Sequence, residues 1–178
     1  MKVHEEHKTH APKHLNIALV IVSTSRYNEI KERGQSSDKT VDIVKSIFEK
    51  HENISLISTE FVPDSADFLT TKVLSLVDKD NIDAIILSGG TGLSPKDITF
   101  ETVSPMLEKE LSGFGEIFRY LSYEEIGSSA MLSRATGGVI KKKIVFLLPG
   151  SPNAVKLALE KLIAPELGHI VYLINKEE

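Results

Sequence analysis

The chain has 178 residues, of which 41% are hydrophobic and 26% are charged, as in an ordinary soluble globular domain. Its formal net charge of −4 gives no general attraction to nucleic acid or to an anionic membrane surface. The absence of cysteine excludes disulfides, thiolate nucleophiles and cysteine metal sites. We see no apolar run of membrane-spanning length and no signal-peptide core, so we expect a cytoplasmic protein.

The first fourteen residues are polar and include four histidines, His4, His7, His10 and His14. Such a composition is compatible with metal binding. Nothing apolar would hold these histidines in place, however, so we favour a flexible tail. The predicted organisation is a histidine-rich tail over 1–14 and one α/β domain over 15–178.

Nearly continuous apolar, β-branched segments alternate with amphipathic segments along the rest of the chain. The apolar segments predict strands that are buried on both faces, at 15–23, 54–62, 84–88 and 143–148. The amphipathic segments predict helices at 39–50, 65–77, 99–111, 114–123 and 152–174, the second capped by Asp64 or Ser65 and the last by Ser151. We interpret 24–38 and 127–138 as loops. This alternation predicts a single three-layer α/β domain with a mostly parallel sheet and helices on both faces.

The most informative stretch is 82–101, where a buried strand runs into a glycine-rich turn and then into a helix. The strand ends at Ser88 and is followed by Gly89, Gly90, Thr91 and Gly92. Glycines let backbone N–H groups approach a phosphate, and the start of the following helix, for which Thr99 is the predicted N-cap, adds partial positive charge. The segment therefore predicts an anion-binding site.

Four unusual loops, at 23–38, 63–64, 88–97 and 149–153, each follow a predicted strand. Ligands of parallel sheets bind beyond the carboxyl ends of the strands, so we expect these loops to meet at one edge. The glycine turn is not a dinucleotide fingerprint, because no third glycine follows Gly92 at the required spacing. The segment 34–40 is not a phosphate-binding P-loop either, because Asp38 stands where the second glycine is required.

Four segments together resemble the MoaB/MogA family of molybdenum cofactor biosynthesis proteins: SGGTGLSPKDITFE (88–101), PGSPNAV (149–155), VPD (62–64) and GFGEIFR (113–119). The resemblance extends from about Leu15 to the C-terminus. It implies a single α/β domain, a homo-oligomer (a trimer or a dimer of trimers), and the adenylylation of molybdopterin by Mg-ATP. Two alternatives stay open: a non-catalytic molybdopterin-binding module, and the molybdate-insertion step of larger relatives, which we disfavour because those proteins carry additional domains. A molybdate-insertion protein is also an expected partner.

By this resemblance, Asp64 and Asp97 are the catalytic and Mg²⁺-binding residues. The residues expected to bind molybdopterin or ATP are Ser88, Gly89, Gly90, Thr91, Gly92, Ser133, Pro149, Gly150, Ser151 and Asn153. The chemistry suits these residue types. The attacking phosphate oxygen is already ionised near neutral pH, so the main obstacle is repulsion between two anionic substrates. Mg²⁺ prefers one or two carboxylates together with phosphate oxygens and water.

Each of these assignments has a purely structural alternative. Asp64 is well placed to cap a helix and Asp97 to order a turn. Ser133 can serve as an ordinary loop serine, and Arg134 can either meet an anion or form a surface salt bridge. The chain also departs from the family at Val41, where relatives commonly carry a small residue. We therefore rank the neighbouring residues 38 and 40 low as ligand contacts.

Overall fold

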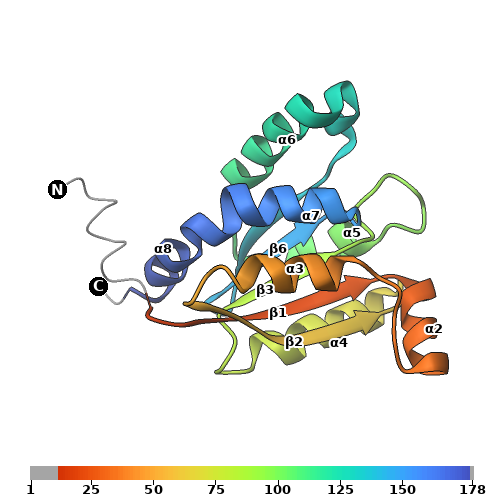
Figure 1. The fold of residues 1–178 in the computed structure, drawn as a ribbon, viewed down its shortest axis with the longest axis horizontal. Coiled ribbons are helices and arrows are strands. Elements are labelled where there is room, and N and C mark those ends of the chain that lie inside the picture. Colours follow the sequence, from red (N-terminus) through yellow and green to blue (C-terminus); the bar gives the residue numbers. More distant parts are fainter. Residues whose placement is uncertain (1–11, 177–178) are drawn as a thin grey trace.

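The computed structural model describes residues 12–176 and shows a six-stranded sheet with the strand order β2-β1-β3-β6-β5-β4 (Figure 1). The strands β2 (Ile54–Val62), β1 (Leu15–Val22), β3 (Ala84–Ser88) and β6 (Lys143–Leu148) are parallel. The strand β5 (Thr136–Ile140) and the edge strand β4 (Lys109–Glu110) are antiparallel to their neighbours. The predicted mostly parallel sheet is therefore confirmed.

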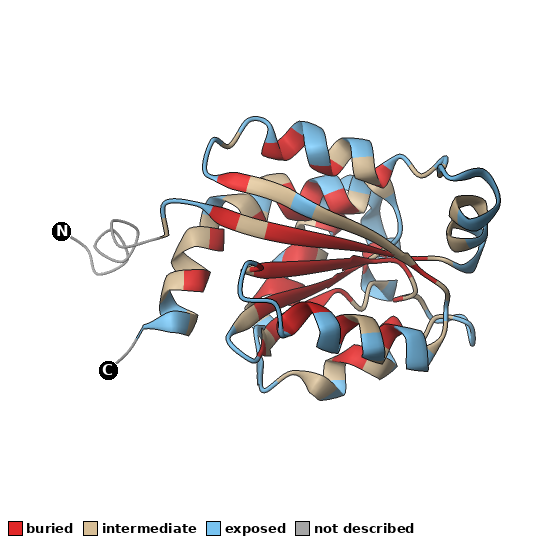
Figure 2. Cartoon of the chain, turned by 90° about the horizontal axis from the view of Figure 1, so that it is seen from below, coloured by how far each residue is buried: buried red, intermediate tan, exposed pale blue. Residues whose placement is uncertain are grey.

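The central strands are buried on both faces, as their continuous apolar sequences predict (Figure 2). Alternate side chains of β1 enter two separate cores: Ile17 and Leu19 pack on one side, and Ala18 and Val20 on the other. All four are fully buried. The strict alternation follows from the two-residue period of a strand, and it requires a helical layer on each face.

Helices form both of these layers, which confirms the predicted three-layer domain. One face is covered by α3 (Thr40–Phe48), α7 (Pro152–Ala158) and α8 (Ala164–Asn175), and the other by α4 (Ala66–Val77) and α5 (Thr99–Val103). A π turn, η3 (Leu159–Ile163), joins α7 to α8, so the predicted closing helix has nearly its predicted extent. In Figure 1 the helix α6 (Ser112–Ile126) projects beyond the sheet.

The order of the strands reverses between β1 and β3. From β1 the chain moves outwards to β2, and β3 then pairs with the opposite side of β1. The carboxyl ends of β1 and β3 consequently send their loops in different directions. Such a switch point opens a crevice at the edge of the sheet, where ligands of α/β proteins bind.

The prediction of a loop over 24–38 was wrong, because Thr24–Arg33 forms the helix α2. This helix buries none of its residues and therefore has no apolar stripe that a periodicity argument could detect. Its ends carry local signals instead. The Ser23 side chain accepts a hydrogen bond from the backbone of Arg26, and Gly34 adopts the left-handed conformation just after the last turn.

The prediction of one helix over 99–111 was also wrong. The helix α5 ends at Val103, a 3₁₀ turn η1 (Ser104–Met106) follows, and β4 then joins the edge of the sheet. Pro105 explains the early end, since a proline inside a helix lacks an N–H donor and its ring clashes with the preceding turn. Thr99 is not the N-cap, because Ile98 occupies that position and Thr99 begins the helix.

The predicted loop over 127–138 contains a 3₁₀ helix η2 (Gly127–Leu132) and the start of β5. A tight hairpin joins β5 to β6, with Lys141 and Lys142 both at positive φ. Strand β5 contains two glycines, which have low strand propensity, and for this reason the sequence did not predict it. The predicted histidine-rich tail lies mostly outside the described residues, and β1 begins at the predicted domain boundary, Leu15. Within residues 12–176, no helix is long and apolar enough to cross a bilayer.

Candidate functional site

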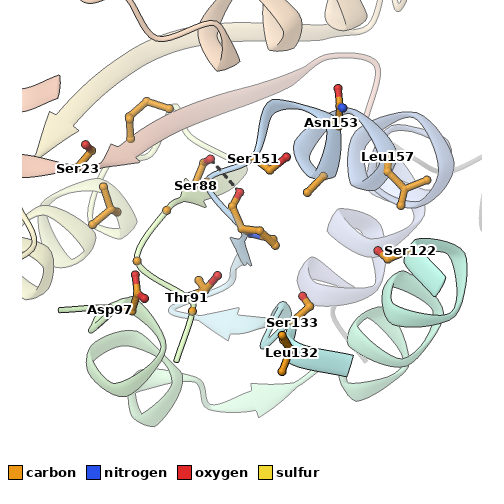
Figure 3. A pocket seen from close by; sticks show the side chains of 18 of the residues that line it. Ser23, Ser88, Thr91, Asp97, Ser122, Leu132, Ser133, Ser151, Asn153 and Leu157 are labelled. Carbon is orange, nitrogen blue, oxygen red and sulfur yellow. Dashed lines mark hydrogen bonds between the residues drawn. The ribbon is translucent and has the colours of Figure 1, made fainter. Parts of the chain in front are cut away.

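A cleft of about 700 Å³ lies at the carboxyl edge of the parallel strands. All four loops that the sequence singled out contribute to its wall (Figure 3). Figure 3 shows Asp97 and Thr91 of the glycine segment, Ser151 and Asn153 at the start of α7, and Ser133 after η2 around one common space. The structure thus brings all twelve predicted site residues together: Asp64, Ser88, Gly89, Gly90, Thr91, Gly92, Asp97, Ser133, Pro149, Gly150, Ser151 and Asn153.

The carbonyl groups of the glycine turn are held from the side that faces away from this cleft. Thr99 is fully buried and fastens two of them: its Oγ1 donates to the Gly89 carbonyl at 2.8 Å, and its backbone N–H donates to the Gly90 carbonyl at 2.8 Å. Thr99 does not line the cleft. The residue predicted to cap a helix therefore serves to shape the glycine turn.

Arg134 fastens the next two carbonyls. Its Nε donates to the Thr91 carbonyl at 2.9 Å, and its Nη2 donates to the Gly92 carbonyl at 2.5 Å. The guanidinium also pairs with the Glu101 carboxylate and lies 5.0 Å from the centre of the Phe100 ring. The hydrogen bond from Arg134 lowers the pKa of Glu101. Of the two roles left open for Arg134, the structure shows a salt bridge, and that salt bridge is anchored on the glycine turn.

These four bonds decide where the amide groups of the turn point. In a planar trans peptide the N–H is directed opposite to the C=O of the same unit, and the described chain has no cis bond. The N–H groups of Gly90, Thr91 and Gly92 consequently point away from Thr99 and Arg134. None of the described residues accepts a hydrogen bond from them. The Gly89 N–H differs, because it donates to the Leu148 carbonyl at 3.1 Å and is not available to a ligand.

The turn requires glycine for steric reasons. Gly89 has a φ of +111°, and a Cβ there would meet the Val22 carbonyl oxygen at 2.3 Å. A Cβ on Gly90 would meet Oγ1 of Thr99 at 2.4 Å. The backbone can pass this close to β1 and α5 only because no side chains are present.

The loop after β6 lies directly beside the glycine turn. The Ser88 hydroxyl donates to the Pro149 carbonyl at 3.2 Å. A Cβ on Gly150 would come within 3.3 Å of the Gly89 Cα. Ser151 is the N-cap residue of α7, as predicted, but its side chain makes no capping hydrogen bond. The cleft therefore meets the uncapped first turn of a helix next to the amides of the glycine turn.

The two predicted catalytic aspartates both line the cleft, and each also has a structural contact. The half-buried Asp97 accepts a hydrogen bond from the Ser94 backbone at 3.1 Å through Oδ2. The exposed Asp64 accepts hydrogen bonds from the Thr24 backbone at 2.9 Å and from its hydroxyl at 2.8 Å, also through Oδ2. Asp64 does not cap α4, where Ser65 holds that position. No described residue donates to Oδ1 of either aspartate.

The opposite wall of the cleft comes from α6 and η2, and sequence reasoning assigned only Ser133 there. It presents apolar and hydroxyl side chains, among them Phe118, Ser122 and Leu132. The Ser122 hydroxyl donates to the Phe118 carbonyl at 2.8 Å, and the Ser133 hydroxyl accepts from the Ala135 backbone at 3.3 Å. No local motif marks this wall, since it depends on how α6 and η2 pack against the rest of the domain.

Comparisons with known proteins identify the family of this chain. The family described as "Probable molybdopterin binding domain" matches residues 18–169. Molybdenum cofactor biosynthesis protein B of Bacillus cereus is 43% identical over 97% of this chain and 98% of its own length, and that of Bacillus subtilis is 43% identical over 98% of each. The crystal structure of a molybdenum cofactor biosynthesis protein B superposes with a TM-score of 0.84 at 42% identity, covering 94% of this chain and 99% of that one.

The chain belongs to this molybdopterin-binding family.

A tungsten cofactor synthesizing protein MoaB from Pyrococcus furiosus has the same fold, with a TM-score of 0.79 and 35% identity over 93% of this chain and all of that one. The resemblance to the MoaB/MogA family is thus confirmed, and the chain takes part in molybdenum cofactor biosynthesis.

Carboxylates dominate the charged side chains of the cleft lining. Its described lining contains four carboxylates, Asp38, Asp64, Asp97 and Glu125, against one cation, Arg26. Arg26 is itself paired with Glu29 at 2.8 Å. No group of three or more acidic or histidine side chains that could hold a metal occurs among the described residues. Two carboxylates with unbonded oxygens match Mg²⁺, which completes its shell with phosphate oxygens and water.

Proposed function

We propose that this protein transfers AMP from ATP to the terminal phosphate of molybdopterin in a Mg²⁺-dependent reaction. One observation carries the proposal: the amide groups of Gly90, Thr91 and Gly92 have no acceptor in the described chain, and all three residues line the cleft. Buried or partly buried amides are nearly always satisfied, so such a set is suited to an anionic ligand. A nucleotide phosphate provides the acceptor oxygens.

In the proposed step, a terminal phosphate oxygen of molybdopterin attacks the α-phosphorus of ATP. The new O–P bond forms as the bridging bond between the α- and β-phosphates breaks, and pyrophosphate leaves with that bond's electron pair. The attacking oxygen is already ionised, so no general base is required. The amides of residues 90–92 would stabilise the charge that develops on the non-bridging oxygens.

Asp97 and Asp64 would hold Mg²⁺, which when bound neutralises phosphate charge. Their contacts through Oδ2 fix both carboxylates on the chain while Oδ1 stays available. Asp97 is bonded within the turn that follows the glycines, and Asp64 is bonded to the first residue of α2. This arrangement places one carboxylate on each of two separate loops of the cleft.

The apolar wall would take the organic part of the second substrate. The exposed side chains of Ile126 and Leu132 would provide a surface for a flat heterocycle, and the Ser133 hydroxyl lies on the same side of the cleft. With the phosphate-binding amides on the facing wall, the cleft has the two unlike halves that a reaction between a nucleotide and a pterin requires.

The first prediction concerns the charge of Asp97. We expect Asp97→Asn to lower pyrophosphate release from ATP, Mg²⁺ and molybdopterin by at least about 100-fold, because a neutral amide is a poor Mg²⁺ ligand. Molybdopterin binding, measured by fluorescence titration, should stay within about threefold of wild type. The matched control is Asp67→Asn, since Asp67 is exposed in the first turn of α4 and does not line the cleft. Equal turnover of wild type and Asp97→Asn would refute the metal role.

A non-catalytic function is the alternative. On that reading, the protein holds molybdopterin or its adenylylated form for a partner such as a molybdate-insertion protein. The same assay separates the two functions. Wild-type protein that binds molybdopterin but releases no pyrophosphate with Mg-ATP supports the binding module and contradicts the transferase.

A further inference from the structure

We propose that Arg134 is a positioning residue that holds the second half of the glycine turn, keeps the Gly92 amide directed into the cleft and thereby supports the neighbouring amides of Gly90 and Thr91. The inference rests on the proposed function, since it concerns the site that would receive the nucleotide phosphates. Arg134 itself does not line the cleft, although Thr91 and Gly92 do. It acts on the ligand through the backbone and not by contact.

The contacts of Arg134 define what it can do. Two of its nitrogens donate to consecutive carbonyls, those of Thr91 and Gly92. Each of these bonds sets the rotation of a peptide plane, so the bond to Thr91 turns the Gly92 N–H towards the opposite side. A turn rich in glycine has few steric preferences of its own, and external bonds must therefore choose its conformation.

The guanidinium is fixed from behind by two further partners. Its Nη2 donates to Oε2 of Glu101 at 3.1 Å, and its Nη1 pairs with the other carboxylate oxygen. The Phe100 ring lies under its face, with the central carbon 5.0 Å from the ring centre. The Arg134 side chain is only 23% exposed. These partners hold its planar fork in a single orientation.

Lysine cannot replace this arrangement. An ammonium group is a point charge on a flexible stem, whereas the observed contacts need several donors in one plane. The positive charge is not the useful property, since Glu101 already neutralises it locally. We therefore expect geometry, and not net charge, to determine the effect of substitutions at this position.

The test compares Arg134, which donates to the glycine turn, with Arg119, which donates to the segment that carries Arg134 and not to the turn. Arg119 donates through Nη1 to the Ala135 carbonyl at 3.1 Å and does not line the cleft. The full-length variants Arg134→Gln, Arg134→Lys and Arg119→Gln are compared with wild type. Mg-ATP affinity is measured by calorimetry, and the backbone amide signals of residues 90–92 are followed by NMR in the ligand-free protein.

We expect Arg134→Gln to weaken Mg-ATP binding roughly tenfold and Arg134→Lys to weaken it nearly as much. Both should shift the amide signals of residues 90–92. Arg119→Gln should leave affinity and signals at wild-type values. Glu101→Gln is a second variant in case Arg134→Gln does not fold. It removes only the charge of the exposed carboxylate that pairs with Arg134, and it should shift the same amide signals.

Two results would overturn the inference. One is a folded Arg134 variant with wild-type amide signals and wild-type affinity. The other is an equal loss of affinity in Arg119→Gln, which would mean that general loosening of the segment is responsible. The proposed function fails separately: wild-type protein that does not bind Mg-ATP contradicts it, while the amide signals of Arg134→Gln still decide whether this residue orders the turn.

Discussion

Gly89 lies where β3, β1 and the loop after β6 come closest together. Its amide is bonded to Leu148, its carbonyl to Thr99, and its missing Cβ leaves room for the Val22 carbonyl. Three elements therefore depend on one residue without a side chain. A glycine in this setting is a structural requirement of the site, independent of any ligand.

We predict that Gly89→Ala destabilises the protein by about 3 kcal/mol or more, because positive φ strain adds to a backbone clash. The matched control is Gly34→Ala. Gly34 also has a positive φ, of +71°, but a Cβ there would meet nothing within 4 Å. Its replacement should cost only about 1 kcal/mol. Urea unfolding of both variants measures the difference, and equal losses would show that the approach to Val22 does not matter.

At this scale, sequence reasoning selected the residues of the glycine wall well and their local bonds poorly. All of the predicted residues except Ser133 lie at or just after the ends of strands, which are readable from sequence, and all twelve line one cleft. The roles of Thr99 and Arg134 were not predicted. Their bonds to the turn depend on where α5 and the segment after η2 lie in space, which no local pattern encodes.

The junction between β3 and α5 is the element that gives the cleft its amides. Thr99, the first residue of the short helix, fastens the turn through both its hydroxyl and its backbone. A five-residue helix has little stability of its own, so this junction must be stabilised by tertiary contacts. The start of α5 and the glycine turn form one structural unit.

We predict that Thr99→Val costs about 1–3 kcal/mol, since the buried Gly89 carbonyl loses its donor. Mg-ATP affinity should fall as well, because the first peptide plane of the turn is released. Thr102→Val is the control: its Oγ1 donates at 2.7 Å to the Ile98 carbonyl within the helix and not to the turn. Thermal unfolding and calorimetry test both variants. A loss of affinity in Thr102→Val alone would contradict the assignment.

The elements missed by sequence reasoning share a cause. Strand β5 contains Gly137 and Gly138, which read as a loop. In the fold, a Cβ on Gly137 would meet the Phe146 ring at 2.8 Å, and one on Gly138 would meet the Lys109 carbonyl oxygen at 2.4 Å. Close packing against β6 and β4 selects glycine there. The buried parallel strands were predictable because their signal is local, whereas these edge strands depend on their neighbours.

The cleft is lined by loops that follow four different strands of the sheet, β1, β2, β3 and β6. A ligand that spans them should stabilise the entire fold and not one element alone. We predict that Mg-ATP at 100 times its dissociation constant adds about 2.7 kcal/mol of stability. For a domain of this size, that corresponds to a rise of roughly 5–10 °C in the unfolding midpoint.

With ATP and a chelator, the unfolding midpoint should change little. The four carboxylates of the cleft repel a triphosphate that carries no Mg²⁺. Mg²⁺ without nucleotide is the control for effects of the cation on stability. Identical shifts with and without Mg²⁺ would contradict the role of the cation. Differential scanning fluorimetry of the full chain is sufficient for all three conditions.

The homo-oligomer implied by the family resemblance stays a prediction at this scale. The surface of α6 and η2 outside the cleft exposes several large apolar side chains, namely Ile117, Tyr120, Tyr123 and Met131. Surfaces of this kind on soluble proteins often mark contacts with other molecules. Analytical ultracentrifugation of the full chain measures the state directly.

The contact between Gly150 and Gly89 has a consequence for redesign of the protein. Because a Cβ on Gly150 would come within 3.3 Å of the Gly89 Cα, a side chain at this position would have to push the two backbones slightly apart. Substitutions of Gly150 that are meant to accommodate a larger ligand would therefore strain the contact between the loops that follow β3 and β6. Changes intended to alter ligand specificity should instead begin at α6, whose side chains line the opposite wall of the cleft.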